Sequence, residues 1–227
     1  MSDASGPEAS AQAALEFVED GQTLGLGTGR AAAAFVRALG ERVRGGLNVR
    51  GVPTSEATDA LAREVGIPLL TLEEAGRLDA TFDGADEVDP NLDVIKGYGG
   101  ALVREKIVAA SSDRLYILVG DEKLVDRLGQ RGKLPVEVVP FARPLAERRM
   151  AELGCKGHVR KTDGGETYLT DNGNLVLDAE VGPITDPGAL DRDLLMIPGV
   201  LGTGLFVGMA DAVVVQDGER VEVRRRS

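Results

Sequence analysis

The chain has 227 residues, of which 43% are hydrophobic and 28% charged, and its formal net charge is −11. This composition is that of a globular protein and excludes a disordered one. The negative charge argues against a nucleic-acid partner, because phosphate backbones are bound by clustered lysine and arginine. The only basic cluster, Arg224-Arg225-Arg226, is expected to be a solvated tail.

Targeting and redox signals are few. No apolar run approaches the ~20 residues that a membrane helix needs. Met1–Ala9 is small and acidic, without the basic-then-apolar order of a signal peptide. Cys155 is the single cysteine, which excludes an intrachain disulfide and fits a reducing compartment. We therefore expect a cytoplasmic protein with no membrane partner.

The first part of the chain alternates strand and helix patterns. Ala13, Ala14, Phe17 and Val18 recur at helical spacing, and Leu115–Val119 is a strong β run. Helices are expected at 9–20, 31–43, 56–65 and 101–110, and strands at 23–27, 48–52, 68–72, 79–82 and 115–119. Alternation with short links predicts an α/β fold with a doubly wound, mostly parallel, Rossmann-like sheet.

The pattern changes after Lys133. Strands are expected at 136–139, 158–161, 174–179 and from Val200, with helices at 144–153 and 186–196, the second capped by Asp186. This β-α-β-β-α-β order is that of a ferredoxin-like α+β sandwich. A final hairpin is expected at 212–215 and 220–223. We predict a main catalytic domain at 1–133 plus 205–227, with an α+β domain inserted at 134–204.

A glycine-rich turn, Gly25-Leu26-Gly27-Thr28-Gly29-Arg30, leads from the first predicted strand into a helix. It is not a dinucleotide fingerprint, because Arg30 stands at the third glycine and Pro53-Thr54-Ser55 stands where a ribose-binding acid is needed. A helix N-terminus still offers free N–H groups and a positive dipole end, which suit a phosphate. The alternative, a tight turn with no ligand, stays open.

The most informative stretch combines Phe82–Glu87 with Lys96–Lys106. Its glycines let backbone N–H groups approach a ligand, and its charged groups can move protons. Thr28, Asp83 and Lys96 each follow a predicted strand, and ligands bind parallel sheets at the carboxyl ends of strands. We expect these residues and Glu105 to meet in one crevice.

Glu105 is a candidate base for removing a proton beside a carbonyl, and Lys96 is a candidate for stabilising the resulting enediolate. The alternative for Glu105 is a helix-surface acid between Arg104 and Lys106.

We expect no metal site. Asp83 and Asp86 are followed by Asp89 and Asp93, but Ala85 stands where a calcium loop supplies an oxygen ligand. One histidine, His158, and one cysteine argue against zinc or iron.

Together these segments resemble ribose-5-phosphate isomerase, type A. The residues that carry the resemblance follow the family order along nearly the whole chain: Pro53-Thr54-Ser55, Asp83–Glu87, Lys96–Lys106, Pro135–Val138, Thr170–Asn174 and Ile197–Val200. The resemblance implies interconversion of D-ribose 5-phosphate and D-ribulose 5-phosphate through an enediolate, in the non-oxidative pentose phosphate pathway. It also implies no metal or organic cofactor, and a homodimer or homotetramer.

The resemblance also implies residue roles. Glu105 shuttles a proton between C2 and C1, Asp83 assists opening of the furanose ring, and Lys96 with the neighbouring N–H groups stabilises charge on oxygen. Asp86 holds sugar hydroxyls, and Lys123 lies near the substrate. The implied substrate-binding residues are Thr28, Gly29, Arg30, Ala31, Asp83, Gly84, Ala85, Asp86, Lys96, Gly97, Tyr98, Gly99 and Lys123.

Three features depart from the family pattern. Arg30-Ala31 stands where the family usually has Ser-Thr, so a guanidinium that could grip phosphate replaces two hydroxyls. Tyr98 replaces a glycine, and a left-handed backbone there is costly for tyrosine. Some members carry a lysine in the first helix, whereas no lysine precedes Lys96 here.

Two rival functions stay open. A sugar-phosphate sensor domain of the same fold binds without turnover, although the few residues before the first helix leave no room for a helix-turn-helix. A coenzyme A transferase-like enzyme would use Glu105 as an acyl acceptor, which the short chain and the Lys96 loop fit poorly.

Overall fold

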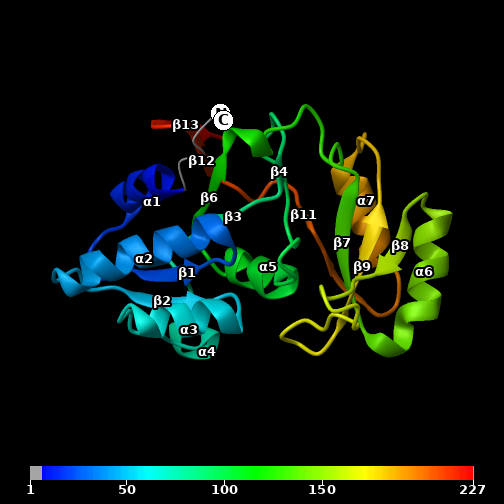
Figure 1. The fold of residues 1–227 in the computed structure, drawn as a ribbon, viewed down its shortest axis with the longest axis horizontal. Helices are drawn as coiled ribbons and strands as arrows, with labels where there is room; N and C mark the ends of the chain where they lie inside the picture. The colour runs from blue at the N-terminus through cyan, green and yellow to red at the C-terminus, as the bar shows by residue number, and fades with distance from the viewer. Residues whose placement is uncertain (1–6, 227) are drawn as a thin grey trace. The chain divides into compact units, whose positions relative to one another are not determined.

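The computed structural model describes residues 7–226, which fall into two units (Figure 1). The first unit holds residues 7–85, 104–123 and 209–226, and the second holds Asp86–Val103 and Leu124–Gly208. The domain boundaries expected from the sequence stay a prediction. Residues 1–6, which carry most of the signal-peptide argument, lie outside the described residues.

A six-stranded sheet in the order β13-β12-β6-β3-β1-β2 forms the first unit. Neighbouring strands in this sheet are parallel except β12 and β13, which form the expected antiparallel hairpin. The strands are β1 (Thr23–Leu26), β2 (Arg50–Pro53), β3 (Ala80–Gly84), β6 (Leu115–Gly120), β12 (Ala212–Asp217) and β13 (Arg220–Arg225). The predicted α/β class with a mostly parallel sheet is confirmed. Arg224 and Arg225 are exposed as expected, but they belong to β13 and not to a tail.

The helices of this unit are α1 (Glu8–Ala14), the 3₁₀ turn η1 (Leu15–Phe17), α2 (Arg30–Arg44), α3 (Glu56–Glu64), α4 (Leu72–Ala75), the part of α5 (Leu102–Ala110) from Arg104 onward, and the 3₁₀ turn η2 (Asp121–Lys123). The first helix is shorter than predicted because the backbone becomes extended at Val18. The predicted strand 68–72 was also wrong. Leu69 makes only an isolated bridge to Gly51, and Thr71 forms a capping box with Glu74 that starts α4.

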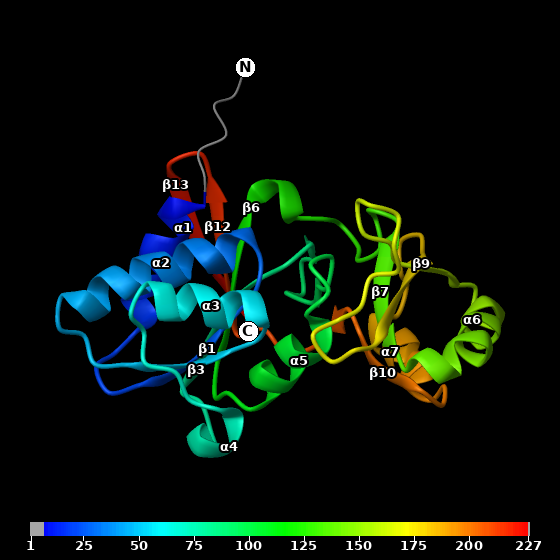
Figure 2. The same cartoon turned by 60° about the horizontal axis from the view of Figure 1, so that its bottom comes forward.

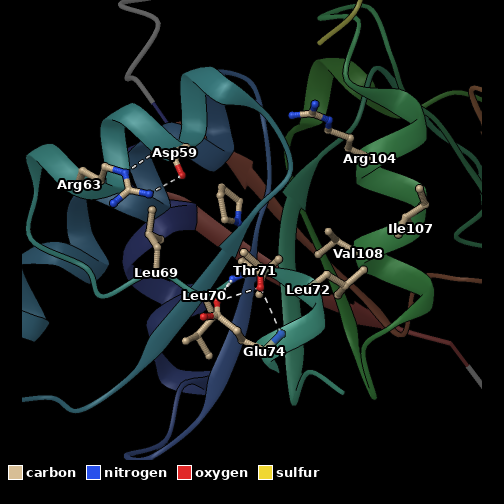
Figure 3. Close-up of a pocket in the computed structure, with 12 residues that line it drawn as sticks. Asp59, Arg63, Leu69, Leu70, Thr71, Leu72, Glu74, Arg104, Ile107 and Val108 are labelled. Carbon is tan, nitrogen blue, oxygen red and sulfur yellow. Dashed lines mark hydrogen bonds and ion pairs between the residues drawn. The ribbon is translucent and has the colours of Figure 1, made fainter. Parts of the chain in front are cut away.

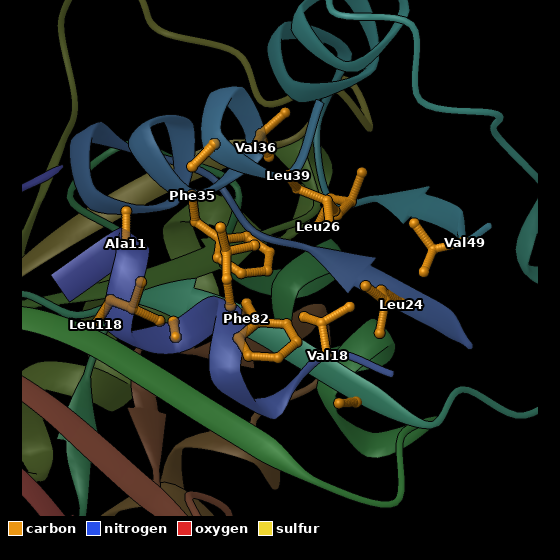
Figure 4. Packing of buried hydrophobic residues seen from close by; sticks show 14 of the residues in the cluster. Ala11, Val18, Leu24, Leu26, Phe35, Val36, Leu39, Val49, Phe82 and Leu118 are labelled. Atoms are coloured by element: carbon orange, nitrogen blue, oxygen red, sulfur yellow. The ribbon is translucent and has the colours of Figure 1, made fainter. Parts of the chain in front are cut away.

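Side chains along each strand point alternately to the two faces of the sheet, and the apolar side chains on one face form a core. Leu24 and Leu26 of β1 pack with Phe35 of α2, whose ring stacks on Phe82 with centroids 4.3 Å apart (Figure 4). Gly25 lies between them and faces the other side, where a Cβ atom would collide with Thr81 and the α5 side chain Val108. Glycine at this position therefore lets α5 pack directly on β1.

The second unit contains a four-stranded antiparallel sheet in the order β10-β7-β9-β8. Figure 2 labels three of these strands, β7, β9 and β10. Its elements are β7 (Lys133–Val138), η3 (Pro140–Ala142), α6 (Arg143–Glu152), β8 (Lys156–Val159), β9 (Leu175–Glu180), α7 (Pro187–Leu195) and β10 (Val200–Thr203). The predicted β-α-β-β-α-β order is confirmed, and Asp186 caps α7 by accepting a hydrogen bond from the N–H of Ala189.

A three-stranded antiparallel sheet was not predicted. Its strands are β4 (Glu87–Val88), β5 (Val94–Ile95) and β11 (Leu205–Phe206), in the order β11-β5-β4. These strands are too short to show the alternation of apolar and polar residues that predicts a strand. Lys96 follows β5, so its expected place at the end of a parallel strand was wrong. Among residues 7–226, no helix has the length and hydropathy to cross a membrane.

Candidate active site

The carboxylate of Asp83 is fixed at the carboxyl ends of β1 and β3. Its Oδ1 accepts hydrogen bonds from the N–H groups of Thr28 (3.1 Å) and Gly84 (2.7 Å), and the residue is 1% exposed. Gly27 lies against this carboxylate so closely that a Cβ atom would overlap it. The glycine-rich turn is therefore shaped around a buried acid.

A cluster of hydroxyl groups surrounds Thr28. Its Oγ1 lies 2.7 Å from Oγ1 of Thr54, 2.8 Å from Oγ of Ser55 and 3.2 Å from Oγ1 of Thr58. Ser55 also caps α3 by accepting from the N–H of Thr58. From the sequence, Thr54 and Ser55 were recognised only as part of a motif, and Thr58 was missed. The run of hydroxyl residues directly after a strand was the available signal.

The N-terminus of α2 follows this turn. Gly29 is the N-cap with a φ of 104°, and a Cβ atom there would meet open space. The first N–H groups of α2, at Arg30 and Ala31, have no partner within the helix, and such groups suit an anion. Ala31 and Gly84 lie close together, since a Cβ on Gly84 would be 3.8 Å from that of Ala31.

The Arg30 side chain is at the surface. It is 83% exposed, and its Nη2 lies 3.9 Å from Oε1 of Glu122 in η2. Lys123 is the next residue of that turn, directly after β6. The expectation that Arg30 grips a phosphate stays a prediction, and its visible partner is an acid.

Glu105 lies in the first turn of α5 and is 4% exposed. A surface acid between Arg104 and Lys106 would be solvated, so that alternative was wrong. Burial of an acid is costly, and buried acids are often functional.

The Lys96 loop belongs to the second unit. Lys96 is 2% exposed, its N–H donates to the carbonyl of Gly204 (2.8 Å), and its Nζ lies 5.7 Å from the ring centroid of Phe206. Asp86 is tied to the same loop, because its Oδ2 accepts from the N–H of Tyr98 at 2.9 Å. The structure therefore brings Asp86 and the predicted oxygen-binding loop together.

Tyr98 fits the loop without backbone strain. Among residues 7–226, Leu92 is the only non-glycine with a positive φ, and the left-handed positions of this loop are Gly97 and Gly100. The expected energetic cost of a left-handed backbone at Tyr98 was therefore wrong. The ring lies under Nζ of Lys133 at 4.3 Å, and its hydroxyl donates to the Lys133 carbonyl. Burial, with the charges of Glu87 and Asp86, raises the pKa of Tyr98 and keeps this donor protonated.

Two residues that contact this loop, and an acid that holds one of them, were missed from the sequence. Nη1 of Arg160 donates to the carbonyls of Gly97 and Tyr98, each at 2.9 Å, while its Nε and Nη2 bind the carboxylate of Asp178. The hydroxyl of Tyr168 donates to the Gly99 carbonyl at 3.3 Å. Arg160 lies 62 residues from Tyr98 in the chain, so no local pattern reveals the contact.

The predicted site residues are divided between the units. Asp86 and Lys96–Gly99 belong to the second unit, and the others belong to the first. That they share one crevice stays a prediction. Within the residues the structure describes, no three His, Cys, Asp or Glu side chains gather as metal ligands.

A separate cavity of about 410 Å³ lies in the first unit, among α3, α4 and α5 (Figure 3). The Asp59–Arg63 ion pair stands on one side and Ile107 on the other. None of the predicted site residues lines this cavity.

Comparison with known proteins points to one family. The family model for ribose 5-phosphate isomerase A (phosphoriboisomerase A) matches residues 50–220. Ribose-5-phosphate isomerase A of Bradyrhizobium diazoefficiens is 51% identical over an alignment 223 residues long, which covers 94% of this chain and 92% of the relative. That of Roseiflexus castenholzii is 51% identical over 90% of this chain and 88% of its own length.

Solved structures agree. Ribose 5-phosphate isomerase A from Methanocaldococcus jannaschii superposes with a TM-score of 0.91 at 39% identity, covering 96% of this chain and 97% of the other. A D-ribose-5-phosphate isomerase in complex with phospho-erythronic acid gives a TM-score of 0.93 at 38% identity, covering 97% of each chain. Sequence and fold agree over nearly the whole length, and this chain belongs to the ribose 5-phosphate isomerase A family.

Proposed function

We propose that this chain catalyses the reversible isomerisation of D-ribose 5-phosphate to D-ribulose 5-phosphate. Family membership supports an isomerase acting on a sugar phosphate. The observation that carries the mechanism is the burial of Glu105, 4% exposed in the first turn of a helix. A carboxylate there suits general base catalysis, because it is held in one place and shielded from water.

In the reaction, Glu105 takes the proton from C2 of the open-chain aldose, and the electrons of that C–H bond move toward the C1 carbonyl. The resulting enediolate carries its negative charge on oxygen. The proton of the C2 hydroxyl moves to the C1 oxygen, Glu105 returns its own proton to C1, and the carbonyl forms at C2. Hydrogen moves within one molecule, so the reaction balances without an external oxidant or reductant.

Asp83 serves the step before this transfer. Opening the furanose ring takes a proton from the C1 hydroxyl and delivers one to the ring oxygen. Oδ1 of Asp83 is occupied by two backbone N–H groups, which fix the carboxylate for this proton transfer.

Lys96 and the N–H groups of Gly97 and Gly99 stabilise the enediolate oxygen, while Asp86, which accepts the N–H of Tyr98, holds sugar hydroxyls. Fixed donors aimed at a developing charge are usually a large contribution to catalysis. The phosphate is held by the Thr28–Ala31 turn and Lys123. Gly84 and Ala85 line the sugar beside Asp83. No metal or organic cofactor takes part in this scheme.

We further propose that the enzyme works in the cytoplasm as a homodimer or homotetramer. Sedimentation velocity of the purified chain at several concentrations checks the assembly. A monomer at micromolar concentration contradicts it.

The test of the function is conversion of ribose 5-phosphate to ribulose 5-phosphate in EDTA, with the wild type beside Glu105→Gln. Turnover that falls by several orders of magnitude in the variant supports both the reaction and its base. The matched control is Glu41→Gln, an exposed glutamate on α2, which leaves turnover unchanged.

The other outcomes separate the rivals. Near-normal turnover in Glu105→Gln removes that residue from the mechanism. Intact binding of ribose 5-phosphate without turnover in the wild type supports the sensor instead. Transfer of label from an acyl-CoA to the protein supports the transferase.

A further inference from the structure

The loop after Lys96 is a closed turn whose orientation depends on one side chain. The N–H of Gly100 donates to the carbonyl of Gly97 at 3.0 Å, which closes a four-residue turn. The carbonyl of Gly97 accepts a second hydrogen bond from Nη1 of Arg160, and the next carbonyl, that of Tyr98, accepts from the same nitrogen.

This pair of hydrogen bonds sets the direction of two N–H groups. In a trans peptide the C=O and the following N–H point to opposite sides, and the described chain contains no cis peptide bond. With the carbonyls of Gly97 and Tyr98 turned toward Arg160, the N–H groups of Tyr98 and Gly99 turn away from it. The first reaches Oδ2 of Asp86 at 2.9 Å, and the second points toward the same side from an exposed residue.

Arg160 itself is held rigidly. Its side chain is 10% exposed and its Nε and Nη2 form a forked pair with the Asp178 carboxylate on β9. Its backbone is bonded on both sides, from its own N–H to the Val176 carbonyl and from the N–H of Tyr168 to its carbonyl. A guanidinium presents its donors in a fixed planar fork that suits an acid and two carbonyls at once, whereas a lysine ammonium is a compact charge without such a fork.

We propose that Arg160 and Asp178 are positioning residues for catalysis, which act by aiming the N–H of Gly99 at the oxygen that gains charge in the enediolate. This inference rests on the proposed function. Neither residue touches the reacting atoms in it. Tyr168 supports the same turn through its hydrogen bond to the Gly99 carbonyl.

The variant Arg160→Lys keeps the positive charge and removes the fork. It is expected to lower kcat by about 10- to 100-fold, because a misaimed donor loses much of its effect on the transition state. The KM for ribose 5-phosphate changes little, since the proposed phosphate contacts at Thr28–Ala31 are untouched.

The inhibition constant of phospho-erythronic acid distinguishes a positioning role from a merely structural one, because a merely structural role would leave this constant unchanged. Its carboxylate places negative charge on oxygen at the reacting end of the sugar chain, where the enediolate also carries charge. Its inhibition constant is therefore expected to rise in Arg160→Lys by about the factor by which kcat falls. A loss of folded protein lowers kcat but leaves the inhibition constant of the remaining folded enzyme unchanged.

Asp178→Asn is the second variant, since it weakens the grip on Arg160 without changing the arginine, and it decides the matter if Arg160→Lys does not fold. Arg143→Lys is the matched control, because Arg143 forms an ion pair with Glu147 in α6, a helix of the same unit that includes neither the turn nor the Arg160–Asp178 pair. The control is expected to leave kcat and the inhibition constant unchanged.

Unchanged kcat in both test variants overturns the inference, as does a fall in kcat with an unchanged inhibition constant. Either result leaves the proposed function intact, provided that the wild type turns over and the Glu105→Gln variant does not. A wild type without turnover overturns the proposed function and this inference together.

Discussion

The N–H of Thr28 donates to Oδ1 of Asp83 over 3.1 Å and so joins the turn after β1 to the end of β3, 55 residues away in the chain. The same oxygen also accepts from the N–H of Gly84, so two parallel strands end on one buried carboxylate. Asp83 therefore holds the turn together as well as serving as a proposed proton-transfer group. These two roles respond differently to substitution.

Asp83→Asn is expected to keep the fold, because the amide oxygen can accept both N–H groups. Its kcat falls by about 10²- to 10⁴-fold, as for the loss of a general acid–base group. Asp83→Ala is expected to lower the free energy of unfolding by a further ~1–3 kcal/mol, because two buried donors lose their acceptor. Urea unfolding and the isomerase assay on both variants check this. Equal stability of the two variants contradicts the structural role.

Arg30 is expected to bind the substrate phosphate in competition with Glu122, which lies 3.9 Å away. Arg30→Ala raises KM by about 10-fold while kcat changes little, because contact with a remote phosphate is uniform across the reaction. Glu122→Gln shifts KM in the opposite direction, since it releases the guanidinium. Initial rates against substrate concentration measure both. An unchanged KM in Arg30→Ala means that this side chain does not touch the phosphate.

Tyr98 is expected to contribute to stability more than to turnover. Its ring packs against the buried cluster of the second unit, and its hydroxyl donates to the Lys133 carbonyl. Tyr98→Gly is expected to lower the free energy of unfolding by about 2–4 kcal/mol through lost packing and a more flexible chain. Tyr98→Phe costs about 1 kcal/mol through the lost hydrogen bond. Urea unfolding measures both, and a neutral Tyr98→Gly refutes the packing argument.

The raised pKa of Tyr98 predicts a pH dependence of stability. The unfolded chain releases this proton near the ordinary value of 10.0, whereas the folded chain holds it to higher pH. The contribution of the Tyr98 hydroxyl to the free energy of unfolding is therefore complete below that value and is lost as the pH rises above about 10. Unfolding free energies at about pH 8 and about pH 10.5 are expected to differ more in the wild type than in Tyr98→Phe. Equal slopes in the two proteins contradict this prediction.

Cys155 is expected to be unreactive in the folded protein. It is 4% exposed, and burial raises the pKa of its thiol, so little thiolate is available. Alkylation by iodoacetamide at neutral pH is expected to be at least ~100-fold slower in the native protein than in urea. Mass spectrometry of timed samples measures the rates. Rapid native labelling means that the second unit opens readily around Cys155.

The sequence alone predicted most of the regular structure, because burial on one face leaves a local period. β1 with α2 and the β-α-β-β-α-β order of the second unit were recognised in this way. The strand expected at 68–72 failed because a capping box outweighed a short apolar run. The three-stranded sheet was missed because its strands are two residues long.

The sequence by itself determined the fold class, the family and the acids and lysines proposed for the chemistry, because those depend on local periodicity and on motifs in a recognisable order. Only the tertiary structure decided that Glu105 is buried, that Tyr98 avoids the left-handed region and that Arg160 holds the turn after Lys96. These properties arise from contacts between residues far apart in the chain. Such contacts exist only once the strands are in register, so the residues that position the site carry no signal in their own neighbourhood.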